Sequence, residues 1–137
     1  MTPSGEAGQL PPASGPEVFR PRHRLAHREQ FRTIYEQGLK KPVGPLVVFA
    51  LPNDLGHPRL GLSVGRRVGG AVQRNAVKRR LREAFRFLVA RWPEDRPGLD
   101  LVIVVRPHEC RKPAAYAELL ESAIARIAKH LSKRDEP

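Results

Sequence analysis

Residues 59–91 constrain the fold more than any other part of the chain, because they must bury apolar side chains while carrying most of the net charge. They contain ten of the chain's 25 Lys and Arg residues but one acid, Glu83, and therefore +9 of the formal net charge of +11. Their apolar residues recur at helical spacing over 70–91, which predicts a helix ended by Trp92 and Pro93. One face of that helix can pack against a core, and a neighbouring face remains as a concentrated cationic surface.

Six polar residues of this predicted helix fall within an arc of about 140° on a helical wheel, beside a narrower apolar arc. They are Arg74, Asn75, Lys78, Arg79, Arg82 and Arg86. A guanidinium group can donate two hydrogen bonds to one phosphate, and an amide can donate and accept at a base edge or a 2′-hydroxyl. A solvated surface helix would normally interleave acids at i, i+4, and only Glu83 is present. The pattern therefore indicates a polyanionic partner, most simply RNA.

The remaining apolar patterns predict one α+β domain with the order helix, two or three strands, helix, strand, helix. Short apolar or alternating runs bounded by turn-forming residues are typical of strands, and apolar residues spaced three and four apart are typical of helices. The two runs on either side of the turn-rich residues 52–58 are expected to pair as a hairpin. In chain order the expected elements are a helix at 27–37, a short strand at 40–43, strands at 46–51 and 59–64, a helix at 70–91, a strand at 99–105 and a helix at 113–131.

The two ends of the chain differ from this patterned region in composition. Residues 2–16 are dominated by Pro, Gly, Ser and Ala, with few apolar side chains to offset the entropy of ordering them, so residues 1–20 are expected to form a disordered tail. Residues 21–132 are expected to fold as a single RNA-binding domain, and residues 133–137 to form a second disordered tail. The basic residues 20–24 suit either an extended arm lying on phosphate or a solvated linker.

Membrane proteins, secreted proteins and enzymes with their own active site find no support in the sequence. The longest apolar runs are about a quarter of the ~20 residues that span a membrane, and the first residues lack the apolar stretch of a secretory signal, so a cytoplasmic protein without a membrane partner is expected. The five His residues are scattered and the acids near strand ends lack a second carboxylate, so we expect no catalytic residue and no metal site. Cys110, the one cysteine, is expected to be half-buried as a small apolar side chain.

Residues 61–86 resemble the signature of the bacterial ribonuclease P protein subunit. The core pattern of that family, Ala-Val-x-Arg-Asn-x-x-Lys-Arg-x-x-Arg, is met at Ala71, Val72, Arg74, Asn75, Lys78, Arg79 and Arg82. The resemblance extends over about residues 24–131. It implies a two-layer α+β sandwich of αβββαβα order, in which a four-stranded sheet contains a left-handed βαβ crossover through the basic helix, similar to the ribosomal protein S5 domain 2-like fold.

The same resemblance implies a subunit of an endonuclease whose active site lies in RNA. Proteins of the family bind a catalytic RNA that removes the 5′ leader of precursor tRNA, with Mg²⁺ held mainly by that RNA. The contacts with the catalytic RNA would come from the six residues on the arc of the basic helix. The leader would stack on the aromatic side chains of Phe31, Tyr35 and Phe49, with backbone contacts from Arg66, Arg67 and Arg106 nearby. No protein partner is expected.

A second interpretation is a structural RNA-binding module of the ribosome or of ribosome assembly. Such a protein would share the basic helix and the sheet, but it would not need an aromatic surface for a free single strand. Recognition of DNA has less support, because no helix-turn-helix spacing precedes the basic helix.

Overall fold

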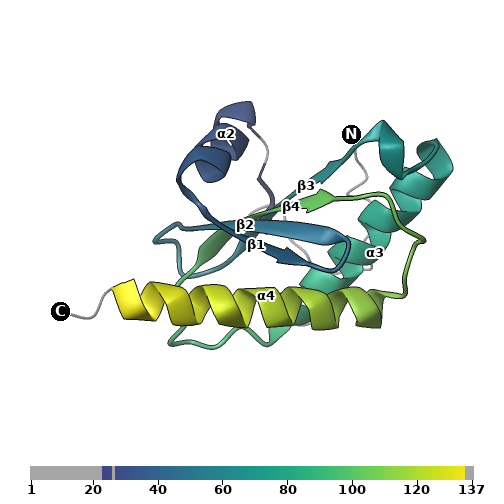
Figure 1. Ribbon diagram of the computed structural model, residues 1–137. Helices are drawn as coiled ribbons and strands as arrows, with labels where there is room; N and C mark the ends of the chain where they lie inside the picture. Colours follow the sequence, from purple (N-terminus) through teal and green to yellow (C-terminus); the bar gives the residue numbers. More distant parts are fainter. Residues whose placement is uncertain (1–22, 26, 135–137) are drawn as a thin grey trace.

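A four-stranded sheet lies at the centre of the computed structural model, which describes residues 23–25 and 27–134 (Figure 1). The strands are β1 (Leu39–Val43), β2 (Leu46–Pro52), β3 (Arg59–Val64) and β4 (Leu99–Val105). They lie in the order β1-β2-β4-β3, with β2 antiparallel to both of its neighbours and β3 parallel to β4. The sheet is therefore mixed, and β3 returns to β4 through a crossover connection.

The helices of the described region are α2 (Arg28–Gln37), the short 3-10 helix η3 (Arg66–Val68), α3 (Ala71–Ala90) and α4 (Pro113–Arg134). In Figure 1, α3 and α4 cover one face of the sheet and α2 lies on the other. All the predicted helices and strands are present, with ends that differ by at most three residues. The tails expected at 1–20 and 133–137 lie outside the described residues, except that α4 continues to Arg134. None of these helices is long and apolar enough to cross a membrane.

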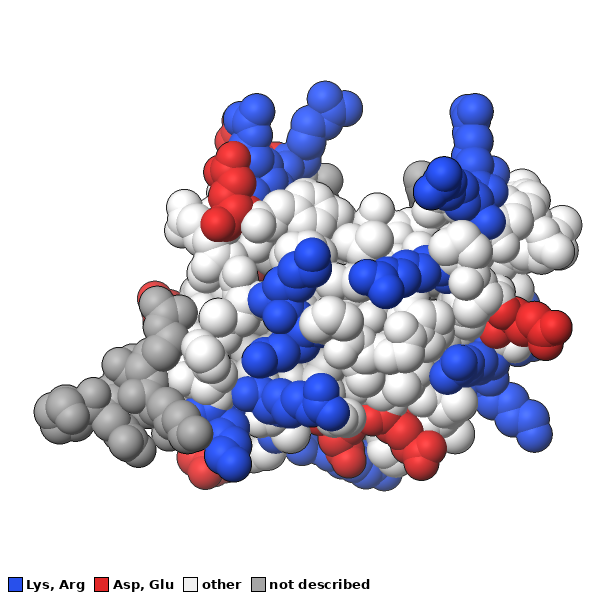
Figure 2. Space-filling model, in the orientation of Figure 1, with Lys and Arg blue, Asp and Glu red and all other residues white. Residues whose placement is uncertain are grey.

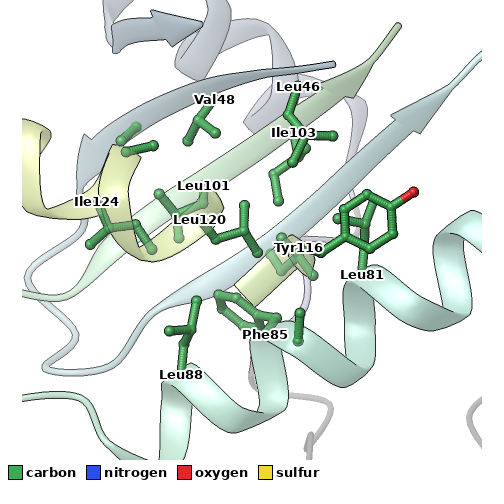
Figure 3. Close-up of a cluster of buried hydrophobic side chains, with 14 of the residues drawn as sticks. Leu46, Val48, Leu81, Phe85, Leu88, Leu101, Ile103, Tyr116, Leu120 and Ile124 are labelled. Carbon is green, nitrogen blue, oxygen red and sulfur yellow. The ribbon is translucent and has the colours of Figure 1, made fainter. Parts of the chain in front are cut away.

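The main core lies between the sheet and the two helices α3 and α4 (Figure 3). Apolar side chains at helical spacing on both helices meet the inward-facing residues of the strands, and nearly all of them are fully buried. The largest are Leu81 and Phe85 from α3, Tyr116, Leu120, Ile124 and Ile127 from α4, and Leu46, Leu99, Leu101 and Ile103 from the sheet. A smaller core on the other face packs Leu25 and Ile34 against Val102. The cationic helix is thus held by its apolar face, as its sequence pattern predicts.

The expected hairpin between residues 46–51 and 59–64 does not form, because β4 inserts between β2 and β3. β4 is apolar on both faces apart from Asp100 near its start, so it takes the position where both faces and both edges are covered. β3 has Gly61 and Ser63 on one face and takes the edge. The hairpin that does form joins β1 to β2 through Gly44, whose φ of 56° costs a glycine no steric strain.

A polar network around Asp100 fixes the β2–β3 turn to β4. Arg59 donates from Nε and Nη2 to the two carboxylate oxygens, each at 2.7 Å, and Asn53 Nδ2 donates to Oδ1 at 2.8 Å. The hydrogen bond from the guanidinium to Asp100, together with the negative charge of this carboxylate, raises the pKa of Arg59. Asp100 is buried, and its oxygens are occupied by these structural contacts.

The phenol of the fully buried Tyr116 holds the loop between β4 and α4, residues 106–112. His108 Nδ1 lies 2.7 Å from the carbonyl oxygen of Arg106, so Nδ1 carries the proton and Nε2 accepts from the Tyr116 hydroxyl, also at 2.7 Å. The backbone N–H of Arg111 donates to the same phenol oxygen at 3.2 Å. Burial raises the pKa of the Tyr116 phenol.

Cys110 lies in this loop and is exposed, so the expectation of a half-buried side chain was wrong. A loop runs over the surface because its backbone polar groups need water or a specific partner. A small side chain in such a loop is exposed with it, whatever its apolar character.

Candidate nucleic-acid interface

The strand register aligns four residues in a row across the sheet, on the face that α2 partly covers. Lys40 of β1 lies opposite Phe49 of β2, Phe49 opposite Val102 of β4, and Val102 opposite Gly61 of β3. Two aromatic side chains of α2 lie against these strand residues: Phe31 contacts Gly61, and Tyr35 contacts Phe49. The sequence assigns three aromatic residues to one surface, and the fold places all three, Phe31, Tyr35 and Phe49, on this face of the sheet. We call these three residues the aromatic row.

Phe31 packs directly on the backbone of Gly61. A Cβ atom at position 61 would lie 2.5 Å from Phe31 Cζ and 2.8 Å from Cε2, closer than non-bonded carbon atoms approach one another. Glycine at this position therefore sets how deeply the Phe31 ring can sit against β3. The ring also contributes to the small core on this face, so it is only partly exposed.

Tyr35 and Phe49 form an edge-to-face pair with ring centroids 5.0 Å apart and an interplanar angle of 86°. Tyr35 is 40% exposed, and Lys40 Nζ lies 5.9 Å from the centroid of the Phe49 ring. An accessible ring beside a cation suits a nucleotide, whose base can stack while its phosphate is neutralised. Lys40 was not among the candidate residues. The sequence does contain a signal for Lys40, because the alternation of side chains along β1 places Lys40 and Lys41 on opposite faces of the sheet.

Three Arg residues follow β3 and β4 at one end of the sheet. Because β3 and β4 are parallel and Val64 lies opposite Val105, both strands finish at the same end of the sheet. Arg66 and Arg67 lie in η3 and Arg106 follows β4, and all three side chains are exposed. Arg106 is four residues beyond Val102, or about 13 Å along an extended strand. A single strand of a few nucleotides can therefore contact both the aromatic row and this arginine end.

The second candidate site is the cationic face of α3. Asn75 and Arg79 are exposed, and Arg74, Lys78 and Arg82 are partly buried, with their stems lying beside the apolar face of the helix. Val72 is 83% exposed on the same stripe as Asn75 and Arg79 and was not selected as a functional residue. An exposed apolar side chain among cations suits contact with a ribose or a base.

The sixth residue of the predicted arc, Arg86, is placed differently from the other five. Its Nη2 donates to both carboxylate oxygens of Glu83, one helical turn away, and its side chain is 15% exposed. Its charge is therefore balanced within the helix itself. A phosphate would have to displace Glu83 before it could bind Arg86.

The chemistry that these two surfaces offer consists of hydrogen-bond donors, fixed positive charges and aromatic rings. Among residues 23–25 and 27–134, no three His, Cys, Asp or Glu side chains come together in a way that could hold a metal ion. Donors and rings of this kind bind phosphates and bases.

The amino-acid sequence of this chain is similar to that of one protein family. The family model described as Ribonuclease P matches residues 19–131. The ribonuclease P protein component of an Exiguobacterium strain is 37% identical over 112 residues, which cover 82% of this chain and 89% of the relative. That of Symbiobacterium thermophilum is 42% identical over 85 residues, covering 61% of this chain and 71% of the relative.

Solved structures show the same similarity. The Staphylococcus aureus ribonuclease P protein has a TM-score of 0.63 at 27% identity, covering 77% of this chain and 96% of that protein. The Thermotoga maritima protein has a TM-score of 0.55 at 30% identity, covering 83% of this chain and 98% of that protein. The structural similarity therefore covers more than three quarters of this chain in both comparisons.

Proposed function

Because the chain belongs to the ribonuclease P protein family, we propose that it is the protein subunit of a cytoplasmic ribonucleoprotein that removes the 5′ leader of precursor tRNA. In this proposal the RNA subunit performs the cleavage, and the protein binds both that RNA and the leader. The observation that supports the proposal is the presence of two surfaces of different chemistry on one small domain: a cationic helix face, and an aromatic row with an arginine end.

We assign the cationic face of α3 to the catalytic RNA. A rigid helix held by its apolar face presents donors at fixed spacing, which suits a folded RNA whose phosphates are also fixed. Arg79 and Asn75 are the most accessible members, and partly buried Lys78 and Arg82 flank them. Arg86 belongs to this set only if the catalytic RNA competes successfully with Glu83.

We assign the aromatic row and the arginine end to the leader. The leader is single-stranded, so its bases are free to stack, and stacking on rings tolerates any sequence at about 1–3 kcal/mol per base. Tyr35 and Phe49 supply the accessible rings, and Arg66, Arg67 and Arg106 supply charge for the backbone. Lys40 adds a cation at the other end of the row.

Mg²⁺ is assigned to the RNA subunit. Mg²⁺ prefers oxygen ligands and commonly bridges phosphates, whereas both proposed surfaces are positively charged and repel a divalent cation. The protein lowers the need for Mg²⁺ by supplying part of the charge that screens the phosphates. This contribution should be largest when Mg²⁺ is scarce.

The test is cleavage of precursor tRNA at low Mg²⁺ concentration by the protein alone, by the matching ribonuclease P RNA alone, and by the two together. We expect cleavage only in the mixture, and none by the protein alone. Cleavage by the protein alone would contradict an RNA active site. No gain on mixing would contradict the proposed role and favour a structural module of the ribosome.

A further inference from the structure

A groove between α3 and α4 lies on the side of the sheet opposite the aromatic row. Its cavity volume is about 330 Å³, which is within the range of small-molecule sites. The residues that line it are Glu83, Ala84, Arg86 and Phe87 from α3 and Pro113, Ala114, Ala117, Glu118 and Glu121 from α4. Apart from Arg86, none of them belongs to either proposed RNA-binding surface.

The walls of the groove are mainly apolar and leave space because their side chains are small. Ala84, Ala114 and Ala117 occur where the two helices approach, and larger residues at these positions would fill the gap. Phe87 is 43% exposed at the border of the groove, with its ring stacked against the guanidinium of Arg91 at 3.6 Å. An apolar body could therefore bury surface against alanine methyl groups and the Phe87 ring.

The polar part of the groove is negative. Glu118 and Glu121 are exposed, lie three residues apart on α4, and form no ion pair with any other described residue. Two like charges at this spacing repel each other, and a bound cation would relieve that repulsion. The third carboxylate, Glu83, is already paired with Arg86. Figure 2 shows acidic side chains along the lower edge of the molecule, next to α4, as well as at its upper left and right, with Lys and Arg side chains spread over the whole face.

Charge and size together select the occupant. RNA is excluded by the two unpaired carboxylates, which repel phosphate. A basic protein segment would satisfy the carboxylates, but it would approach a chain of net charge +11, and that long-range repulsion grows with the number of charges it carries. A small molecule with a single positive charge meets little of this repulsion. Its apolar part can use the alanine and Phe87 walls.

We propose that this groove binds small organic cations that consist of one ammonium or amidinium group on an apolar body of on the order of ten non-hydrogen atoms. The charged group lies between Glu118 and Glu121, and the apolar body lies between the two helices. Arg86 is the one lining residue that is also a proposed RNA contact, and the charged group of the ligand is placed at Glu118 and Glu121, so occupancy does not depend on whether the chain acts in tRNA processing.

The test is a titration of the isotope-labelled full chain with 2-phenylethylammonium, followed by NMR chemical shifts. We expect saturable shifts at Phe87, Ala114 and Ala117. The neutral analogue 2-phenylethanol should bind at least about fivefold more weakly, because it lacks the charge. Equal binding of the two analogues, shifts confined to other parts of the chain, or no shifts up to about 20 mM ligand would each overturn the proposal.

Variants of the full chain locate the site. Glu118→Gln combined with Glu121→Gln should weaken binding of the cation about fivefold and leave binding of 2-phenylethanol unchanged. The matched control is Glu36→Gln combined with Glu109→Gln, which removes the same charge from exposed positions outside the groove. If both double variants weaken binding equally, the effect is one of net charge, and the assignment to this groove is wrong.

Discussion

Gly61 determines the position of an aromatic ring on a different element. It lies in the middle of β3, where its conformation is ordinary, and its importance comes from the contact that it permits with Phe31 on α2. A single methyl group at this position would push the ring away from the strand. Glycine is thus required here by a neighbour in space and not by its own backbone angles.

We expect Gly61→Ala to displace Phe31 and to weaken binding of leader-bearing precursor tRNA by the holoenzyme about fivefold, because one stacking contact is worth about 1–3 kcal/mol. Binding of mature tRNA, which has no leader, should change much less. Gly65→Ala is the matched control, since a Cβ at that position meets nothing within 4 Å. Equal losses in the two variants would show that the Phe31 contact does not matter for the leader.

Tyr116 gives a prediction about pH. Its phenol is buried and bonded to His108 and Arg111, so Tyr116→Phe should reduce the free energy of unfolding at neutral pH by about 1–2 kcal/mol. The folded-state pKa is raised above the unfolded value of about 10. The stabilisation is therefore fully present below pH 10 and is lost as pH rises through the folded pKa. Urea unfolding at pH 8 and above pH 10 should show the difference between wild type and variant shrinking, and a constant difference would contradict this.

At the level of elements, α3 has one apolar face and one cationic face. Its apolar face holds it to the sheet and α4, so its cationic face can be altered without loss of the core. Substitution of an exposed cation on that face, such as Arg79, therefore tests binding rather than folding. The salt dependence of RNA affinity counts the phosphate contacts that are lost.

We expect Arg79→Ala and Arg82→Ala each to weaken binding to the catalytic RNA and to reduce the slope of log K against log salt by roughly 0.7 to 0.9. Lys129→Ala removes the same charge from an exposed position on α4 and should leave the slope unchanged. Filter binding at a series of salt concentrations measures both. Unchanged slopes in both α3 variants would remove this helix from the interface.

Removal of the ion pair between Glu83 and Arg86 is expected to strengthen RNA binding, in contrast to removal of Arg79 or Arg82. Glu83→Gln removes the carboxylate that balances Arg86, so the guanidinium becomes available to phosphate. If Arg86 faces the catalytic RNA, the variant should bind that RNA more tightly and with a salt slope larger by roughly 0.7 to 0.9. The added positive charge acts at long range in any position, so Glu118→Gln is the control. Identical slopes in the two variants would exclude Arg86 from the contact.

At the level of the whole molecule, the aromatic row and the cationic face of α3 lie on different sides of one sheet. A protein arranged in this way can hold two RNA segments at a fixed separation. Shortening the leader of precursor tRNA to one nucleotide should therefore remove most of the affinity that the protein adds to the RNA subunit alone. Changes in the tRNA body should alter the affinity of holoenzyme and RNA alone equally. Equal sensitivity of the protein's contribution to both changes would contradict the assignment of the leader.

The sequence predicts the elements of this fold better than their arrangement. Helical spacing and alternation are local properties, so α2, α3, α4 and the four strands could be located to within three residues. The position of β4 between β2 and β3 depends on which strand has most to bury, a comparison across the whole chain. The position of Lys40 opposite Phe49 depends on the strand register, and the contact between Phe31 and Gly61 depends on how α2 packs on the sheet. The Glu83–Arg86 pair could have been foreseen from their spacing of three.

The parallel pairing of β3 with β4 also sets the order in which the chain can fold during synthesis. β1 and β2 can close as a hairpin as soon as they leave the ribosome, but the partner of β3 is made only after the whole of α3. Until then the edge of β3 is open and the apolar face of α3 has no complete sheet to cover it. Non-local pairings of this kind form slowly, so we expect the pairing of β4 with β2 and β3 to limit the rate of folding. Among the described helices α3 has the largest net positive charge, and it therefore exists as nascent chain before β4 completes the sheet and before α4, its main packing partner, is made.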